Sequence, residues 1–320
     1  MKNQTAPAVP STKPAKSGLQ KTLNAYWRYR YLVLLMIPSI VVLIIFKYVP
    51  IYGVTIAFKN FRIRDGIMGS PWVGLDVFRS VFALPVFWQA FRNTLILGVM
   101  NLVIGFPMPI LLALLLNELR NERYKKCIQT FSYLPHFISW VIMFSLMYSL
   151  FSITNGLINK FLTSLGMSAI NMLSDPKMFY GMLYGTSIWK EAGWGTIIFM
   201  AAIAGVDQEM YEAAYLDGAN RFQQCVHITL PAIAFSVTTM LILNVGSVMG
   251  ANFDQIMNLR TAATQTGVAR VIDTYVYDMG VAKGEYDLST AIGLFQQIVN
   301  CILLFVANAV VNRINGEGFF

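Results

Sequence analysis

The sequence predicts an all-α, polytopic membrane protein with six transmembrane helices. Of its 320 residues, 56% are hydrophobic and only 12% are charged, and the mean hydropathy is +0.55. A soluble domain carries about 25% charged residues, so an ordinary soluble enzyme is excluded. Four long segments contain no Asp, Glu, Lys or Arg: 93–117, 127–159, 222–253 and 288–312. Each exceeds the roughly 20 apolar residues that a spanning helix needs.

The predicted spans follow these apolar segments and the charged residues that flank them. We place them at about 31–57, 91–116, 128–151, 179–205, 229–250 and 288–311. Residues 1–30 are rich in Pro, Ala, Ser and Lys and are expected to form a flexible cytoplasmic tail. Residues 313–320 are expected to form a short cytoplasmic C-terminal tail. The span region, 31–312, is expected to be one transmembrane domain.

The distribution of Lys and Arg predicts that both termini are cytoplasmic. With the N-terminus inside, the inner segments hold 12 basic residues and the longer outer segments hold nine. The N-terminal cluster and a second cluster over 120–126 decide the orientation, because inner loops are enriched in Lys and Arg. The net charge of +8 therefore reflects membrane topology and does not indicate binding to nucleic acid.

The loop between the fourth and fifth predicted spans, residues 206–231, carries strong helix signals. Asp207 is a suitable N-cap, and the acidic Glu209 follows in the first turn. Gly218 is a suitable helix end, because glycine adopts the left-handed conformation at low cost. The pattern predicts two short helices on the cytoplasmic surface that meet at Gly218.

This loop resembles the EAA loop of ATP-binding-cassette (ABC) importer permeases. The family pattern is Glu-Ala-Ala, three residues, Gly, nine residues and Ile-x-Leu-Pro. It fits without a gap at Glu212, Ala213, Ala214, Gly218, Ile228, Leu230 and Pro231. The resemblance implies that the loop is a coupling helix, which sits in a groove of an ATPase subunit. The alternative is an amphipathic helix that merely caps the bundle, but such a helix needs no Gly or Pro at these offsets.

Further stretches resemble the LplB-type polysaccharide permeases, a subgroup of the carbohydrate importers that includes the alginate importer permeases. These stretches are Tyr48–Gly53, Arg92–Thr94, Leu111–Glu118, Gln129, Leu134–Trp140, Ile188–Trp194 and Val271–Val276. The resemblance implies a type I ABC importer permease fold in the bacterial plasma (inner) membrane. It also implies alternating access with four kinds of partner: a second homologous permease, two ATPase subunits that bind ATP and Mg, an extracytoplasmic solute-binding protein, and the saccharide.

Two ionisable residues interrupt the fourth predicted span, where such residues are costly and face a cavity or a partner. An aromatic ring beside polar groups suits a sugar, and carbohydrate permeases line their pocket from the spans on either side of the EAA loop. We therefore expect a substrate pathway formed by Trp189, Lys190, Glu191, Trp194, Asn244 and Ser247. The alternatives are an internal Lys190–Glu191 pair that fixes packing, tryptophans that anchor the interface, and an interhelical hydrogen bond from Asn244.

The sequence contains no recognisable catalytic motif. It lacks a GxxxxGK[ST] phosphate loop, a GxSxG or HExxH motif and a plausible glycosidase carboxylate pair, so we expect neither ATP hydrolysis nor a bound cofactor. His136 and His227 have no carboxylate or Cys at ligand spacing, and both are interpreted as structural. Three rival functions remain: a peptide or amino-acid ABC permease, an ion-coupled secondary transporter using Glu191, and a membrane-bound enzyme or scaffold.

Overall fold

The computed structural model describes residues 27–250 and 252–315, which are mostly helical. Most of the two expected tails, 1–30 and 313–320, lies outside these residues. The chain divides into two compact units, Met1–Thr55 and Ile56–Phe320. The first contains α2 (Arg30–Leu43), a π-helical turn at Ile44–Tyr48 and the start of a 3-10 helix, Val49–Phe58.

Three helical stretches are long and apolar enough to cross a membrane: Arg30–Phe58, Pro85–Asn117 and Tyr286–Arg313. Two bent pairs of helices raise the count among the described residues to as many as five. The fourth predicted span corresponds to α10 (Pro176–Ala204), a helix of 29 residues with the charged Lys190 and Glu191 near its middle. The chain is therefore a helical, multi-pass membrane protein.

Two predicted spans are broken in the structure. Segment 128–151 holds the end of α7 (Glu122–Tyr133), a 3-10 turn (η4, Leu134–Phe137) and α8 (Trp140–Phe151), and the helices on either side meet at 102°. Segment 229–250 belongs to a pair bent by 62°, Arg221–Ala232 and Ala234–Val245. A proline lies near each break, and proline removes a backbone donor from a helix. Hydropathy measures apolarity and not direction, so neither bend could be predicted from it.

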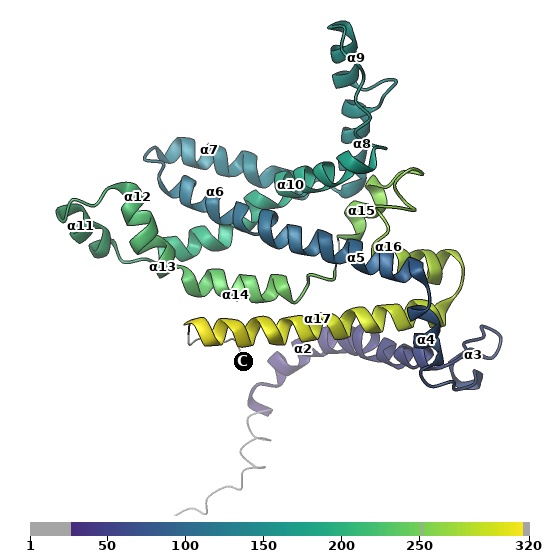
Figure 1. The fold of residues 1–320 in the computed structure, drawn as a ribbon. Coiled ribbons are helices and arrows are strands. Elements are labelled where there is room, and N and C mark those ends of the chain that lie inside the picture. Colours follow the sequence, from purple (N-terminus) through teal and green to yellow (C-terminus); the bar gives the residue numbers. More distant parts are fainter. Residues whose placement is uncertain (1–26, 251, 316–320) are drawn as a thin grey trace, which may run out of the picture. The chain divides into compact units, whose positions relative to one another are not determined.

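In the second unit, the long helices run alongside one another (Figure 1). They are α5 (Pro85–Met100), α6 (Pro107–Asn117), α10, α14 (Ala234–Val245) and α17 (Tyr286–Asn315). Glycines permit two close approaches of α10. A Cβ atom at Gly193 would collide with the Ser132 carbonyl of α7, and one at Gly195 would lie 2.9 Å from Pro109 of α6. Helix α10 is thus packed tightly on two sides.

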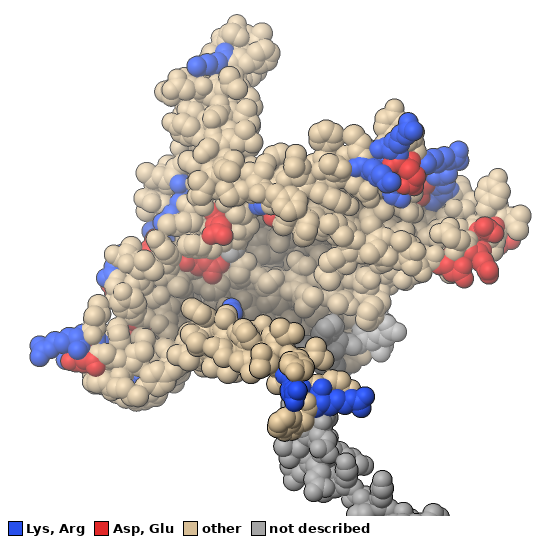
Figure 2. Space-filling model, turned by 180° about the vertical axis from the view of Figure 1, so that it is seen from behind, with Lys and Arg blue, Asp and Glu red and all other residues tan. Residues whose placement is uncertain are grey.

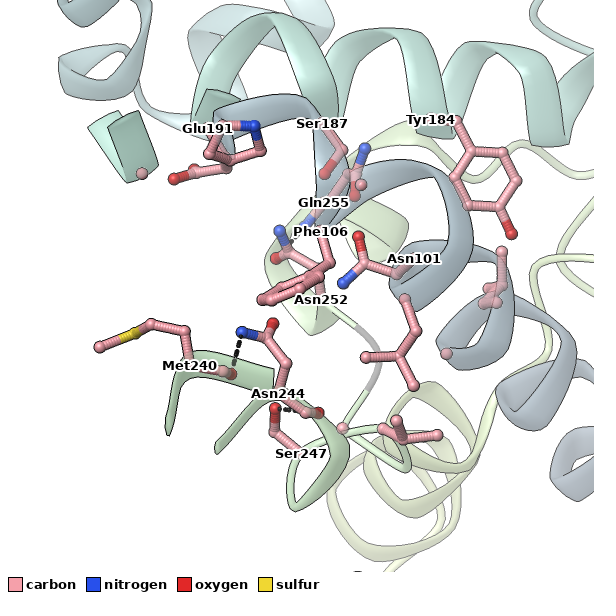
Figure 3. Close-up of a pocket in the computed structure, with 18 of the residues that line it drawn as sticks. Asn101, Phe106, Tyr184, Ser187, Glu191, Met240, Asn244, Ser247, Asn252 and Gln255 are labelled. Carbon is pink, nitrogen blue, oxygen red and sulfur yellow. Dashed lines mark hydrogen bonds between the residues drawn. The ribbon is translucent and has the colours of Figure 1, made fainter. Parts of the chain in front are cut away.

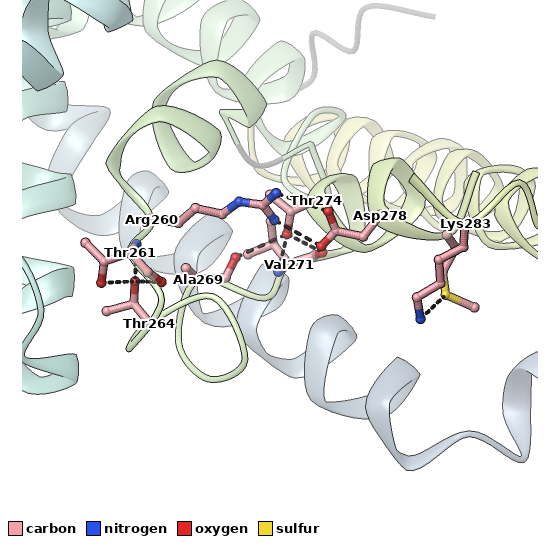
Figure 4. A network of polar contacts seen from close by, with 9 residues as sticks. Arg260, Thr261, Thr264, Ala269, Val271, Thr274, Asp278 and Lys283 are labelled. Carbon is pink, nitrogen blue, oxygen red and sulfur yellow. Dashed lines mark hydrogen bonds and ion pairs between the residues drawn. The ribbon is translucent and has the colours of Figure 1, made fainter. Parts of the chain in front are cut away.

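The segment between α14 and α17 closes one end of the second unit. It contains α15 (Phe253–Leu259) and α16 (Ile272–Tyr277). The guanidinium of Arg260 donates two hydrogen bonds to the Asp278 carboxylate, at 3.0 and 3.1 Å (Figure 4). Asn93 of α5 donates to the Gly267 and Arg270 carbonyls, both at 2.9 Å. The Arg260–Asp278 pair fastens the segment internally, and the Asn93 bonds hold it against α5, beside the cavity described next.

Candidate functional site

A cavity of about 400 Å³ lies inside the second unit (Figure 3). Four stretches form its wall: α5 with the π-helical segment η3 (Asn101–Gly105) and the start of α6, the middle of α10, the end of α14 with the turn that follows it, and α15 with its N-cap. Polar side chains reach it from all four: Asn101, Tyr184, Ser187, Glu191, Asn244, Ser247, Asn252 and Gln255. Apolar groups, including Phe106 and Met240, fill the remaining wall. A hollow lined by amides, hydroxyls and one carboxylate suits a polyhydroxylated ligand.

Hydrogen bonds within the wall hold several of these polar groups in place. Asn244 donates to the Met240 carbonyl at 2.9 Å, and Ser247 donates to the Asn244 carbonyl at 3.0 Å. Gln255 donates to the Leu183 carbonyl at 2.7 Å and to Thr186 Oγ1 at 2.9 Å, which joins α15 to α10. The wall is therefore preorganised before any ligand enters.

Trp194 also lines the cavity, and its ring is held by the bend between α7 and α8. The His136 ring lies parallel to it, with centroids 4.4 Å apart and planes inclined by 3°. Phe137 meets the same indole edge-on at 5.7 Å. His136 Nδ1 is 2.9 Å from Glu191 Oε2. The bend thus positions two cavity residues, one aromatic and one acidic.

This arrangement corrects the interpretation of His136 as a histidine without a carboxylate partner. Its partner Glu191 is 55 residues away in the sequence, so no local spacing pattern could reveal the pair. His227, in contrast, lies 3.0 Å from the Gln223 carbonyl, one helical turn away. That local contact agrees with a structural role.

The six residues predicted for the pathway separate into two groups. Glu191, Trp194, Asn244 and Ser247 line the one cavity. Lys190 does not line it: its side chain is buried, its ammonium donates to the His136 carbonyl, and it lies 5.6 Å from the Trp140 ring centroid. It therefore supports the bend between α7 and α8. Trp189 is exposed and is also absent from the cavity wall.

Sequence reasoning missed five polar lining residues: Asn101, Tyr184, Ser187, Asn252 and Gln255. Asn101 could have been identified from the sequence, because a polar amide in the middle of an apolar span indicates either a helix contact or a ligand pathway. Asn252 and Gln255 lie in the segment between the fifth and sixth predicted spans, outside the stretches expected to form the pathway. Only the folded chain brings that segment onto α10.

The loop after α10 forms the two short helices that the sequence predicted. Helix α11 (Gln208–Leu216) begins at Asp207, whose carboxylate accepts from the Glu209 amide at 3.0 Å. It ends at Gly218, which has φ +81°, and the Ala219 amide donates to the Ala214 carbonyl at 2.9 Å. Helix α12 (Arg221–Gln224) follows, with a reciprocal cap between Asn220 and Gln223. A π-helical turn (η5, Cys225–Thr229) and α13 (Leu230–Ala232) lead into α14.

One face of this loop packs onto the ends of α6 and α10. Ile228 is buried in a cluster with Ala113, Phe199 and Ile203, and Ala214 and Leu230 pack against its edge. Within the loop, Tyr211 Oη lies 2.9 Å from Thr229 Oγ1 and ties α11 to η5. Arg221 pairs with Glu118 at 2.9 Å. The loop is thus mechanically joined to the helix that lines the cavity.

The opposite face of the loop is exposed and mixes large apolar with acidic side chains. Leu216 is 86% exposed, Phe222 77% and Tyr215 74%. Glu212, Ala213, Gly218 and Pro231 are also exposed. Figure 2 shows acidic side chains gathered at the end of the second unit that α11 forms. Large apolar groups with a polar surround are typical of a protein-binding surface.

Comparisons with known proteins agree with this geometry. Residues 105–315 match the family "Binding-protein-dependent transport system inner membrane component". Protein LplB of Bacillus subtilis (strain 168) is 48% identical over 298 residues, which is 93% of each chain. The polygalacturonan/rhamnogalacturonan transport system permease protein YteP of the same organism is 42% identical over 315 residues, which is 98% of each chain.

Two crystal structures contain chains with the same fold. One is a bacterial ABC transporter involved in the import of the acidic polysaccharide alginate, with 36% identity, a TM-score of 0.84, and coverage of 92% of this chain and 99% of that chain. The other is an alginate ABC transporter in complex with an alginate pentasaccharide-bound periplasmic protein, with 36% identity, a TM-score of 0.83, and coverage of 92% and 98%. The chain therefore belongs to the family of inner membrane components of binding-protein-dependent transport systems.

Proposed function

We propose that this chain is a permease subunit of a bacterial ABC importer that carries an oligosaccharide or polysaccharide fragment into the cell. The observation that carries the proposal is the similarity to the alginate importer chains over nearly the whole length of both proteins. The polar cavity agrees with it, because amides, hydroxyls and an indole are suited to a sugar. The chain itself is a transport subunit and not an enzyme.

In this proposal the chain crosses the inner membrane six times, with both termini in the cytoplasm. The spans are the three long helices, the two bent pairs and α10. With an even number of spans and the basic residues concentrated in the inner segments, the loop of α11–α13 faces the cytoplasm. The end of the unit that carries α15 and α16 then faces outward, where a solute-binding protein delivers the saccharide.

The loop of α11–α13 is proposed to couple ATP hydrolysis to transport. Its exposed Leu216, Tyr215 and Phe222 provide apolar surface for an ATPase subunit, and Glu212 provides one charge-assisted contact. Its buried face, through Ile228 and Leu230, passes the motion to α6 and α10. Separate ATPase subunits supply the ATP and Mg chemistry, and a second homologous permease completes the pathway.

The substrate pathway is proposed to pass through the cavity. Trp194 offers an aromatic surface, and Glu191, Asn244 and Ser247 offer hydrogen-bonding groups. Lys190 acts indirectly, because its buried ammonium holds the bend that carries His136. Alternating access then exposes this cavity first to the outside and then to the cytoplasm.

The proposal is tested by reconstituting the complete importer in liposomes and measuring uptake of labelled oligosaccharides. We expect uptake that requires ATP inside the liposomes and the solute-binding protein outside. Dissipating the proton gradient at constant ATP should leave the rate unchanged. Loss of uptake on adding the proton-gradient uncoupler would favour an ion-coupled transporter. Uptake of peptides or amino acids but not saccharides would indicate another class of ABC permease.

A further inference from the structure

Among the residues that the structure describes, the cavity wall has a single acidic side chain, Glu191. The other polar lining groups are amides and hydroxyls: Asn101, Tyr184, Ser187, Asn244, Ser247, Asn252 and Gln255. Within residues 27–250 and 252–315, no Lys, Arg or His lines the cavity. The wall therefore offers many hydrogen-bonding groups but no cation for an anionic ligand.

The two basic residues nearest to Glu191 are outside the cavity wall and already have partners. Lys190 is 6% exposed, and its ammonium donates to the His136 carbonyl and lies 3.8 Å from Glu191 Oε1. His136 contacts the other carboxylate oxygen, Oε2, at 2.9 Å and lies on Trp194. These contacts fix the Glu191 carboxylate, yet neither residue is placed to pair with an anion inside the cavity.

We infer that this chain selects uncharged saccharides, and that Glu191 is the group that excludes sugar carboxylates. A uronate held beside Trp194 would place its carboxylate near that of Glu191 with no cation from this wall to separate them. Like charges repel. The Lys190 ammonium, 3.8 Å from Glu191 Oε1, weakens this repulsion, but it is buried and outside the wall, so the carboxylate is the charge that the ligand meets. The inference rests on the proposed function and narrows its substrate class.

A neutral sugar makes favourable contacts with the same groups. Its hydroxyls donate to the Glu191 carboxylate, and such charge-assisted hydrogen bonds are stronger than neutral ones. The asparagine and glutamine amides can donate or accept for the remaining hydroxyls. His136 covers one face of the Trp194 ring, and Trp194 is still 43% exposed, so it keeps apolar surface for a sugar ring. The inferred preference differs from the acidic polysaccharides in the names of YteP and the alginate transporter.

The test uses the complete importer in liposomes and a mixture of labelled tetra- to hexasaccharides. Neutral members come from mannan, galactan and arabinan, and acidic members from polygalacturonan and polymannuronate. After ATP-driven uptake, the sugars inside the liposomes are separated by anion exchange, and each fraction is normalised to the amount that the solute-binding protein retains. The wild type is compared with Glu191→Gln, and Glu122→Gln serves as a matched control at an exposed position at the start of α7.

We expect the wild type and the Glu122→Gln variant to accumulate the neutral fraction. The Glu191→Gln variant should raise the acidic-to-neutral ratio by about tenfold or more, because it removes the repelling carboxylate and leaves the Lys190 ammonium without its ion-pair partner. A wild type that accumulates the acidic fraction, or a ratio that Glu191→Gln leaves unchanged, would overturn the inference. Failure to accumulate either fraction would contradict the proposed function instead.

Discussion

The cavity and the loop of α11–α13 are built in opposite ways, although α10 connects them. The cavity is concave, and polar side chains from four separate stretches line it. The loop is one continuous segment that exposes Leu216, Tyr215 and Phe222 to the surroundings. From Glu191 to the end of α10 at Ala204 the helix rises about 20 Å. The cavity is suited to discriminating among ligands, and the loop is suited to binding a partner protein.

This difference assigns different kinetic parameters to the two regions. Cavity variants should change the saccharide concentration at half-maximal uptake, because they remove contacts to the ligand. Loop variants should change the maximal rate, because they alter the transmission of ATP-driven motion. A variant that disturbs α10 itself should change both.

The largest effect is expected for Gly218→Val. Gly218 has φ +81°, a conformation in which a β-branched residue is strongly strained, and it joins α11 to α12. We expect the maximal rate of ATP-driven uptake to fall by more than about tenfold, because the coupling surface is displaced. The control is Gly181→Ala, a helical position in α10 with no atom within 4 Å of the added Cβ. Wild-type uptake by Gly218→Val would show that the geometry of this turn is dispensable.

Gly193→Ala should disturb both regions, because it acts on α10. The added Cβ collides with the Ser132 carbonyl, so α7 and α10 must separate. Overpacking of this kind costs about 1–3 kcal/mol of folding free energy. Thermal unfolding of the purified importer should begin at a lower temperature than for Gly181→Ala, and uptake should change in both rate and half-maximal concentration. Equal unfolding temperatures for the two variants would contradict the close packing of these helices.

Trp194→Ala should raise the half-maximal saccharide concentration about tenfold, since an aromatic contact and the partner of His136 are both lost. The maximal rate should change much less. Trp189→Ala is the matched control, because Trp189 lies five residues away on the same helix and outside the cavity wall. Concentration series for uptake give both parameters. An equal change in half-maximal concentration for the two variants would contradict the assignment of Trp194, and not Trp189, to the substrate pathway.

The smallest effect is expected for Asn244→Ala. It removes one hydrogen-bonding group from the cavity and one bond to the Met240 carbonyl. The loss of a single neutral hydrogen bond, about 1 kcal/mol, corresponds to a roughly fivefold increase in the half-maximal concentration. The same concentration series measures this increase. A reduced maximal rate with an unchanged half-maximal concentration would instead assign Asn244 to the coupling of ATP-driven motion.

The loop could be predicted from the sequence because its determinants are local. Asp207 and Gly218 define the ends of α11 within a few residues of one another, and the structure places both as expected. The cavity depends on residues from 97 to 256, which only the folded chain brings together. Composition identified Glu191 as an unusual residue in a span, but its pairing with His136 depends on the 102° bend between α7 and α8. No local pattern carries that information.

The coupling role of α11 is tested most directly by the maximal rate of ATP-driven saccharide uptake in a Leu216→Asp variant of the complete importer. Leu216 is 86% exposed, so the substitution should leave the fold intact while placing a charge in the proposed ATPase contact. We predict that the maximal rate falls at least about tenfold and that the half-maximal saccharide concentration is unchanged. A maximal rate equal to that of the wild type would contradict the account.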